Sequence, residues 1–448
     1  METTMNHKAA FLIVAAAALA LGLAVRTLGA DSEPANPAAE KETSDIDLKQ
    51  LPQDNAAFAM RLYGRLADQK GNLFFSPLGI SQAMAMTYVG AGGQTKAEMR
   101  EALNVPLGRD KQDKLAPWDV DDLAAAYKHL NARLKGDRRS RGRFQIQIDN
   151  ALWGPKGARF KKPFTSLVTG QFGSKLQSLN FAQPEQAAKT INDWIAQHTL
   201  DKTSDLVPPE SLNKSTGLVL TNAVYFRAAW LRPFQADGTK KADFHLDAQK
   251  SVQTDMMRQT AVFKYAQVDG VSVLELPYVD KDTAMVVLLP EKRDGLAELE
   301  KKLAKPPAKD ATTMPGEEST TVLDGYLKKL EIHEVHVALP KFKFSSEAGL
   351  ADALKAMGMK SAFDGQKGKA DFSGMSDGPL YISAVQHKTY VDVDEQGTEA
   401  AAATAVVIPT AEDEPVKDFV ADHPFIFLIR DNDSGSLLFM GRVADPTK

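Results

Sequence analysis

A segment of small residues near the C-terminus constrains this chain most. Residues 395–408 read EQGTEAAAATAVVI and follow a strand-like stretch at residues 390–394. In an extended conformation Thr398, Ala400, Ala402 and Thr404 share one face with Val406 and Ile408, opposite Glu399, and none of them is bulky or charged. The segment can therefore be buried in the middle of a sheet.

The same segment also suits an exposed loop. Alanine is a poor strand former, and Pro409 followed by the sequence EDEP at residues 412–415 is typical of exposed chain. We therefore expect a segment with two conformational states. An alanine-rich helix of about ten residues, capped by Thr398, is the alternative.

Composition narrows the function classes. The chain has 448 residues, of which 43% are hydrophobic and 25% are charged, so it has enough apolar material for a large core. A formal net charge of −4 provides no general attraction to nucleic acid or anionic membranes, and we expect no nucleic-acid partner. The absence of cysteine excludes disulfides and thiolate chemistry, and we expect neither a cofactor nor a metal.

The N-terminus has the pattern of a targeting segment. Residues 1–30 contain Lys8, an apolar run at 9–25 and a Leu-Gly-Ala cleavage signal at 28–30, which predict a signal peptide or, if it is not cleaved, an N-terminal anchor. Residues 31–46 are predicted to be a disordered tether, and residues 47–448 one domain. Export would place the protein in the extracellular space or periplasm, attached to a membrane only through an uncleaved anchor.

Hydrophobic periodicity indicates the α+β class. Helical spacing relates Phe58, Leu62 and Leu66, and again the run from Leu123 to Leu134. Alternation or buried runs predict strands at residues 335–339, 390–394, 284–289 and 424–429. Residues 305–320 contain three prolines and no apolar rhythm, so we expect a flexible insertion between a helix and a strand.

Three motifs resemble catalytic or ligand sites only superficially. Residues 374–378 match G-x-S-x-G but lie in a Gly/Asp/Ser-rich stretch, which favours a turn. His333 and His336 lead into an alternating strand and lack a third metal ligand. The glycines at 90–93 lack the order of a phosphate-binding loop and favour a turn between helices. We therefore do not expect an enzyme.

Motifs along nearly the whole chain resemble signatures of the serpin family, in the family's order. They are NLFFSP at 72–77, NALWG at 150–154, LTNAVYF at 220–226 with Trp230, LELPY at 274–278, LPKF at 339–342, ADFSGM at 370–375 and DHPF at 422–425. Residues 395–408 resemble the reactive-loop hinge. The resemblance covers residues 47–446 and is to inhibitory, exported, prokaryote-like members.

This resemblance implies three β-sheets surrounded by eight or nine α-helices, with an exposed reactive-centre loop at residues 395–418. It also implies a mechanism in which a serine-type protease attacks a bait bond in the loop and forms an acyl-enzyme. The cleaved loop then inserts into the central sheet and traps the protease in a covalent complex. The protein would be a monomeric suicide-substrate inhibitor. A non-inhibitory serpin that acts as a binding or structural protein is the alternative.

The resemblance also implies roles for individual residues. The hinge comprises Glu395, Gly397, Thr398, Glu399, Ala400, Ala401, Ala402, Ala403 and Thr404. We expect Thr398 at the mouth of the sheet, at least partly solvated. Ser76, Asn222 and His387 match a polar cluster beneath the sheet's opening point, and Trp230 matches an aromatic under its top; ordinary core packing explains these four equally well. Gly79 stands where serine is common, so that cluster is expected to lack one partner.

Family spacing from Glu395 places the reactive bond between Ala411 and Glu412, and a slip of one residue places it between Thr410 and Ala411. Either bond presents a small side chain, which suits the shallow specificity pocket of an elastase-like protease.

A local basic cluster follows the helix predicted at 123–134. It comprises Arg133, Lys135, Arg138, Arg139, Arg141 and Arg143. Some family members bind sulfated polysaccharide near this region, so a polyanion site is one interpretation and a solvated basic loop is the other.

Overall fold

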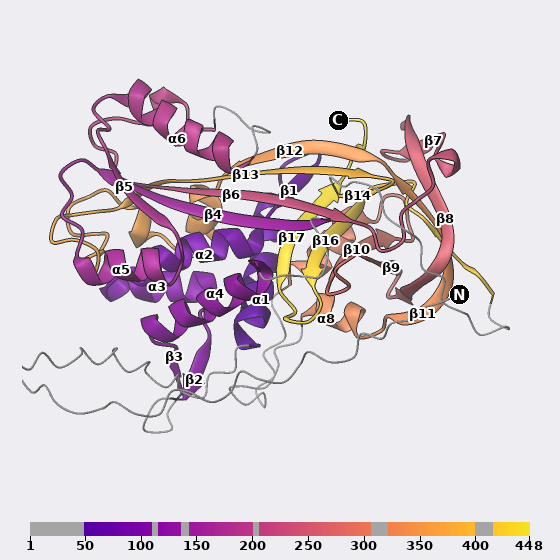
Figure 1. Cartoon of the computed structure of the whole chain (residues 1–448), viewed down its shortest axis with the longest axis horizontal. Helices are drawn as coiled ribbons and strands as arrows, with labels where there is room; N and C mark the ends of the chain where they lie inside the picture. Colours follow the sequence, from indigo (N-terminus) through magenta and orange to yellow (C-terminus); the bar gives the residue numbers. More distant parts are fainter. Residues whose placement is uncertain (1–48, 110–114, 136–142, 200–205, 306–320, 399–414) are drawn as a thin grey trace, which may run out of the picture. The chain divides into compact units, whose positions relative to one another are not determined.

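A six-stranded sheet crosses the upper part of the molecule in Figure 1. The computed structural model describes residues 49–109, 115–135, 143–199, 206–305, 321–398 and 415–448. The strand order is β12 (Phe342–Gly349), β13 (Ile382–Asp394), β14 (Gly397–Thr398), β6 (Leu218–Ala229), β4 (Phe144–Pro155) and β5 (Lys175–Leu179). β6 lies at the middle of this sheet, and the run LVLTNAVYF in it is buried on both faces.

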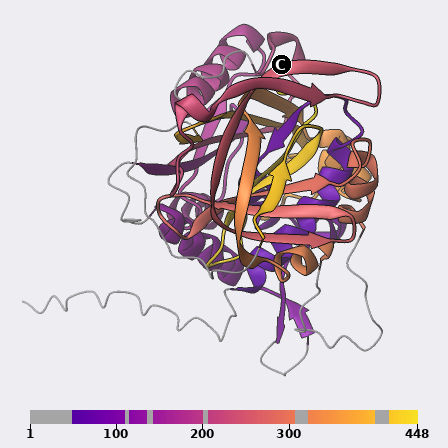
Figure 2. The same cartoon turned by 90° about the vertical axis from the view of Figure 1, so that its right-hand side faces the viewer.

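A second sheet of nine strands carries the C-terminal part of the chain. Its order is β1 (Leu73–Phe75), β17 (Leu437–Val443), β16 (Phe425–Asp431), β10 (Thr283–Pro290), β9 (Val271–Pro277), β8 (Ser251–Val268), β11 (Glu331–Pro340) and β15 (Lys417–Val420), with β7 (Lys240–His245) paired to β8. A separate two-stranded sheet consists of β2 (Leu107–Arg109) and β3 (Leu115–Pro117). In Figure 2 the side of the molecule that carries β8 and β11 faces the viewer.

Nine α-helices complete the described part of the chain, and the expected α+β class with three sheets is confirmed. The helices are α1 (Gln50–Leu66), α2 (Pro77–Tyr88), α3 (Gly93–Leu103), α4 (Val120–Lys135), α5 (Lys162–Gly170), α6 (Pro184–His198), α7 (Leu296–Leu303), α8 (Val322–Leu327) and α9 (Ala351–Ala356). Short 3-10 helices follow at η1 (Pro209–Ser211), η2 (Ala236–Gly238) and η3 (Ser361–Phe363).

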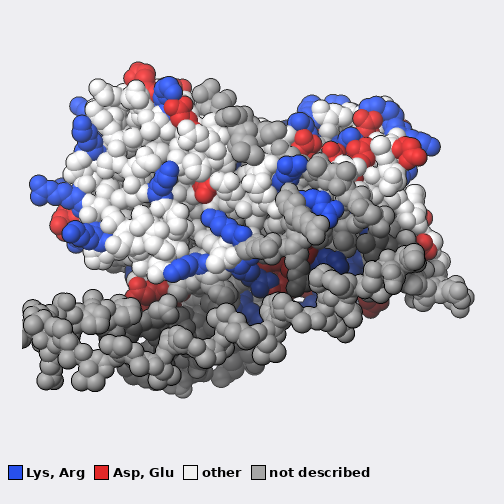
Figure 3. Space-filling model, in the orientation of Figure 1, with Lys and Arg blue, Asp and Glu red and all other residues white. Residues whose placement is uncertain are grey.

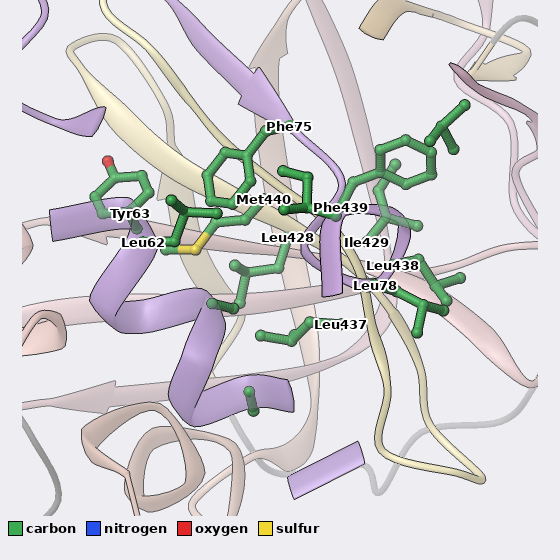
Figure 4. Close-up of a cluster of buried hydrophobic side chains, with 14 of the residues drawn as sticks. Leu62, Tyr63, Phe75, Leu78, Leu428, Ile429, Leu437, Leu438, Phe439 and Met440 are labelled. Atoms are coloured by element: carbon green, nitrogen blue, oxygen red, sulfur yellow. The ribbon is translucent and has the colours of Figure 1, made fainter. Parts of the chain in front are cut away.

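The main core lies between the first helices and the strands of the nine-stranded sheet. Figure 4 shows Leu62 and Tyr63 of α1 beside side chains of β1, β16 and β17. At its centre the ring of Phe74 stacks on Phe427 and Phe439, with centroids 5.4 and 4.9 Å apart. Such a core fixes β1 and α2, and so provides a rigid base beneath the six-stranded sheet.

A smaller core lies between α6 and the six-stranded sheet. Trp153 of β4 meets Trp194 of α6 edge to face at 5.9 Å, and its indole nitrogen donates to the hydroxyl of Thr221 at 2.9 Å. In Figure 1 α6 lies on the opposite side of this sheet from α1 to α5. The sheet is therefore covered by helices on both faces.

The elements predicted from periodicity are present, with one correction. The spacings at Phe58 and Leu123 fall in α1 and α4, and the predicted strands fall in β10, β11, β13 and β16. Residues 306–320 lie outside the described residues, but α7 ends before them and α8 begins after them. The insertion was expected between a helix and a strand, but it joins the two helices α7 and α8. The capping box formed by Thr321 and Asp324 starts the short helix α8 before β11.

The structure describes all three of the motifs that were set aside. The G-x-S-x-G match begins in the turn at residues 373–375, and Ser376 follows this turn in an isolated bridge to Phe160, where its hydroxyl accepts from the backbone N–H of Gly378. His336 lies on β11, and the described residues include no group of three or more side chains that could hold a metal. Gly90 and Gly92 lie between α2 and α3, and Gly93 is the first residue of α3. The signal or anchor at 1–30 and the tether at 31–46 lie outside the described residues and stay predictions. No helix within the described ranges is both long and apolar enough to span a membrane.

Candidate functional site

The hinge residues form a hairpin that enters the six-stranded sheet. The chain leaves β13 at Asp394, turns at Glu395 and Gln396, and returns as β14. Asp394 Oδ1 accepts the backbone N–H of Gln396 at 2.8 Å, and Gly397 adopts a φ of 150°, a positive value that glycine tolerates. The turn reverses the chain direction, so the strand at 382–394 does not continue into the small-residue segment.

β14 lies between β13 and β6 at one end of the sheet. It is antiparallel to both, and Thr398 is opposite Val393 on one side and Ala228 on the other. Beyond Thr398, β13 and β6 pair directly with each other in parallel, up to the partners Thr389 and Val224. The sheet is thus split by an incoming strand at one end, and β13 and β6 pair directly with each other over residues 382–389 and 218–224.

Thr398 is buried, which corrects the expectation that it is partly solvated. Its side chain is 2% exposed, and its hydroxyl lies 2.7 Å from the hydroxyl of Tyr278. Tyr278 is itself buried, and this burial raises the pKa of its phenol far above the ordinary value. Because Thr398 is in a strand, the structure does not support the alternative in which it caps a helix.

Trp230 lies directly against the hinge turn. Its ring stacks on that of Tyr278 with centroids 4.7 Å apart and an interplanar angle of 6°. Its indole nitrogen donates to the carbonyl of Asp394 at 3.0 Å, and its backbone N–H donates to the carbonyl of Gln396 at 2.9 Å. Both bonds hold the turn at the top of the sheet.

Glu395 is fixed by two side chains that the sequence analysis did not assign. Lys341, between β11 and β12, donates to it at 2.8 Å, and Thr239 donates to its other carboxylate oxygen at 2.8 Å. Burial alone would raise the pKa of Glu395, but the hydrogen bonds from Lys341, from the backbone at Glu395 and from Thr239 outweigh burial, and the net pKa is lowered. The hydrogen bond to Glu395 raises the pKa of Lys341. Lys341 lies in the motif LPKF and Tyr278 in the motif LELPY. These two motifs were therefore the sequence signal from which both contacts to the hinge could have been suspected.

A buried polar cluster lies where β13 and β6 meet below β14. The backbone N–H of Ser76 donates to His387 Nε2 at 3.0 Å, so Nδ1 carries the ring proton and donates to Asn222 Oδ1 at 2.7 Å. The Ser76 hydroxyl donates to the carbonyl of Leu438 at 2.7 Å. Burial lowers the pKa of His387 to about 3, and the ring is neutral near pH 7.

Both amide atoms of Asn222 are hydrogen-bonded, whereas the buried Nδ2 of Asn150 beside it has no hydrogen-bond partner among the described residues, in agreement with the expectation that this cluster lacks one. The amide nitrogen of Asn222 donates to Asn150 Oδ1 at 2.7 Å, so Asn150 is a further member of the cluster. A Cβ added at Gly79 would lie 2.7 Å from both amide atoms of Asn222. The space that a serine would fill is therefore taken by Asn222, which the neighbouring side chains hold in place.

The rest of the predicted loop lies outside the described residues. Residues 399–414 are affected. The ones with a predicted role are the hinge residues Glu399, Ala400, Ala401, Ala402, Ala403 and Thr404, and the candidate bond residues Thr410, Ala411 and Glu412. The structure describes the loop where it leaves the sheet at Thr398 and where it rejoins the fold at Pro415, just before β15.

The predicted basic cluster is divided. Arg133 pairs with Asp431, the last residue of β16, at 3.5 Å and also with Asp433 just after this strand. Lys135 is exposed and Arg143 is half-buried, while Arg138, Arg139 and Arg141 lie outside the described residues. On the face shown in Figure 3, basic side chains are spread with uncharged surface between them. The described members do not by themselves form a polyanion site.

The fold and the hinge define a class of α+β proteins whose central sheet is entered by a loop hairpin at one end and closed at the other. The family model for serpin (serine protease inhibitor) matches residues 53–446, and this chain belongs to the serpin family. The resemblance to the serpin family inferred from the sequence is confirmed.

Known relatives agree with this assignment. Leukocyte elastase inhibitor of Equus caballus is 35% identical over 409 residues, covering 89% of this chain and 100% of the relative. A serpin-like protein of Thermococcus kodakarensis is 38% identical over 396 residues, covering 87% and 84% of the two chains.

Solved structures agree as well. Cleaved Serpin 42Da has a TM-score of 0.74 at 29% identity and covers 89% of this chain and 99% of its own. Human thyroxine-binding globulin in complex with its hormone has a TM-score of 0.74 at 27% identity, covering 90% and 100%. The serpin fold is thus confirmed.

Proposed function

We propose that this serpin is a suicide-substrate inhibitor of serine-type proteases rather than an enzyme. The observation that carries the proposal is the register of β14 between β13 and β6. If the loop inserted in the same register, Ala400 would enter between Val391 and Phe226, and Ala402 between Thr389 and Val224. Every position on this face then meets buried neighbours, and every inserted side chain is small.

The same register leads from the hinge to the polar cluster. Two residues further, Thr404 falls between His387 and Asn222, which are hydrogen-bonded to each other in the closed sheet. Insertion must break this bond, and the threonine hydroxyl can supply a replacement partner for one of the two groups. The hinge composition and the cluster are therefore suited to the same movement.

The energy available supports trapping. Insertion of about a dozen residues would add a strand with hydrogen bonds on both sides, each contributing on the order of 1 kcal/mol before the lost β13–β6 pairing and the entropy of ordering the loop are subtracted. A gross gain near 10 kcal/mol is comparable to the stability of a whole domain. The intact protein would be metastable and the cleaved form its stable state.

The specificity proposed is for elastase-like proteases. The bond after Ala411, or after Thr410, presents a small side chain, and the similar proteins of several mammals are named leukocyte elastase inhibitor. The similarity to thyroxine-binding globulin is the reason to test the alternative of a non-inhibitory binding serpin.

We further propose that residues 1–30 direct export, that the protein acts as a monomer, and that any polyanion binding depends on residues 135–143.

The test is incubation with elastase-, chymotrypsin-, subtilisin- and trypsin-like proteases, followed by denaturing electrophoresis and mass analysis of the cut. We expect an SDS-resistant complex with the elastase-like enzyme, broken after Ala411 or Thr410. The cleaved protein should also melt well above the intact one, because the inserted strand completes the sheet. Failure to form a complex with any protease, or equal melting temperatures after a confirmed cut, would favour the binding serpin.

A further inference from the structure

A buried histidine lies just after β15, the strand in which the reactive loop ends. It is His423, which follows Asp422 in the motif DHPF between β15 and β16, and 5% of its surface is exposed. Its Nδ1 lies 2.7 Å from Asp422 Oδ1, and its Nε2 lies 2.7 Å from the carbonyl oxygen of Pro290 at the end of β10. Each ring nitrogen therefore faces an oxygen atom.

Both ring nitrogens of His423 must donate in this arrangement. The carbonyl oxygen of Pro290 can only accept a hydrogen bond, and the same holds for an ionised carboxylate. The hydrogen bond from His423 lowers the pKa of Asp422 against the effect of burial, and the nearby Arg293 lowers it further, so the carboxylate is ionised near neutral pH. A neutral imidazole has one N–H to donate, whereas the protonated ring has two. The two contacts thus define a positively charged ring.

Asp422 connects this point to two further elements. Its Oδ2 lies 3.3 Å from Arg293 Nη2, in the segment between β10 and α7, and 3.9 Å from Nε2 of His245 at the end of β7. Its carbonyl oxygen accepts the backbone N–H of His245 at 2.7 Å. The other charged side chains of the segment after β10 are exposed: Glu291, Lys292 and Asp294. We call the connected group the loop clamp, and its members are His245, Pro290, Arg293, Asp422 and His423.

We propose that His423, in its charged form, is a positioning residue that fixes the C-terminal end of the reactive loop to the fold. For its effect on inhibition this inference rests on the proposed inhibitory function. The loop clamp ties the chain after β15 to β7 and to the end of β10. A neutral ring would leave one of the two oxygens without its donor, so the clamp would lose one of its buried hydrogen bonds.

The loop clamp opposes insertion of an uncut loop. β15 pairs with the last part of β11, and Lys341, the residue after β11, binds Glu395, so β15 lies near the end of the sheet where the hinge enters. A strand inserted from Thr398 to Ala411 would be about 43 Å long, whereas the six residues after Ala411, up to Lys417, span at most about 22 Å. An uncut loop could insert this far only if β15 left β11. Cleavage disconnects the inserting segment from β15, so the clamp should affect the lifetime of the intact inhibitor and not the trapping step.

The lifetime should depend on pH. Histidine changes its charge between about pH 5 and 8, so the loop clamp should hold at mildly acidic pH and weaken as pH rises. A buried hydrogen bond to a charged group is worth about a tenfold change in a rate or more. We expect the half-life of inhibitory activity of the uncut protein to be about tenfold longer at pH 6 than at pH 8.5. His387 is neutral over this whole range and does not contribute.

Three variants and the wild type are stored at both pH values and assayed against the protease of the panel that forms the SDS-resistant complex fastest, with mass analysis to verify that the loop is uncut. His423→Gln has no charge at either pH and should have the short half-life at both. His423→Arg is charged at both and should keep the long one. His336→Gln is the control, because its pair with Asp418 is exposed and screened by solvent, and it should keep the wild-type pH dependence. Freshly prepared proteins should all trap with the same stoichiometry.

Two measurements test the loop clamp without a protease. Nitrogen NMR at pH 6 should show protons on both ring nitrogens of one histidine whose signals are absent from His423→Gln. Hydrogen exchange of the β15 amides at pH 8.5 should be slower in His423→Arg than in His423→Gln. A singly protonated ring at pH 6, or equal exchange in the two variants, would overturn the proposal even if the arginine variant were less stable.

The outcomes separate the two proposals. A wild type that traps the protease but has the same half-life at both pH values overturns the loop clamp and leaves the inhibitory function standing. Unchanged pH dependence in His423→Gln does the same and assigns the effect to another group, with His245 the next to replace. A wild type that traps no protease overturns the inhibitory function, and the NMR and exchange results then decide whether charged His423 fixes β15.

Discussion

The hydroxyl of Thr398 lies 2.7 Å from that of Tyr278, and this buried bond joins the first inserted residue of the hinge to the residue that follows β9. Both groups are shielded from water, so neither has an alternative partner if the other is removed. The intact protein therefore holds the start of its loop inside the sheet.

We predict that Thr398→Val, which keeps the shape and removes the hydroxyl, lowers the free energy of unfolding of the intact protein by about 1–2 kcal/mol. Tyr278→Phe should have a similar effect, and the double variant should cost little more than either single one, because both remove the same bond. Urea unfolding of the uncleaved protein measures all three. Additive losses would show that the two hydroxyls do not depend on each other.

A charged residue on the inserting face should convert the inhibitor into a substrate. Thr398→Arg is expected to stop trapping, but because Thr398 is already buried it should also destabilise the intact fold by several kcal/mol. Ala400→Arg tests the next position on the same face, which the register continued from β14 would bring between Val391 and Phe226 on insertion. The number of inhibitor molecules consumed per protease should rise at least tenfold while the loop is still cut.

Glu399→Arg is the matched control, because residue 399 falls on the opposite face. It should trap with nearly the wild-type stoichiometry. If Ala400→Arg and Glu399→Arg behaved alike, the register continued from β14 would be wrong.

The ion pair of Glu395 and Lys341 should stabilise the hinge turn. Lys341 is 38% exposed, so solvent screens the pair and the coupling energy should be only about 1 kcal/mol. A double-mutant cycle of Glu395→Gln and Lys341→Met, measured by urea unfolding at low and high salt, tests this. The coupling should shrink as salt rises; a coupling near zero at low salt would leave Thr239 as the effective partner.

Gly79→Ala should destabilise the protein although alanine is the better helix former. The added Cβ would meet Asn222, which cannot move without losing His387 or Asn150, and we expect a loss of about 1–3 kcal/mol. Gly325→Ala in α8 is the control, because nothing lies within 4 Å of its added Cβ. There we expect a gain of about 0.5–1 kcal/mol. Thermal unfolding should show a lower melting temperature for Gly79→Ala and a higher one for Gly325→Ala than for the wild type. A Gly79→Ala protein as stable as the wild type would show that Asn222 adapts.

Acid should weaken the sheet through His387. The native state keeps this ring neutral down to about pH 3, whereas the unfolded chain takes up a proton below about pH 6.5. Between these values the unfolded state binds more protons, so the free energy of unfolding falls by about 1.4 kcal/mol per pH unit as pH decreases. His387→Gln should show a shallower decline over pH 6 to 4 in denaturant titrations. Equal slopes for both proteins would mean that His387 is protonated in the folded state.

Local sequence determined much of this protein. The apolar spacing from Phe58 to Leu66 specified α1, and the alternation at Val335 to Leu339 specified β11, because a helix or strand buries one face at a fixed period. The small residues after Glu395 indicated a segment that can be buried, and the motifs identified the family. These are properties of neighbouring residues, which the chain order displays directly.

Only the tertiary structure decided which partners meet. Tyr278 reaches Thr398 across 120 positions, Lys341 reaches Glu395 across 54, and Arg133 is drawn to Asp431 rather than left for a polyanion. Periodicity states that a side chain faces inward, but not which distant group it meets there. The burial of Thr398 and the space taken at Gly79 depend on how strands β6, β13 and β14 come together, and that arrangement arises only when the whole core packs.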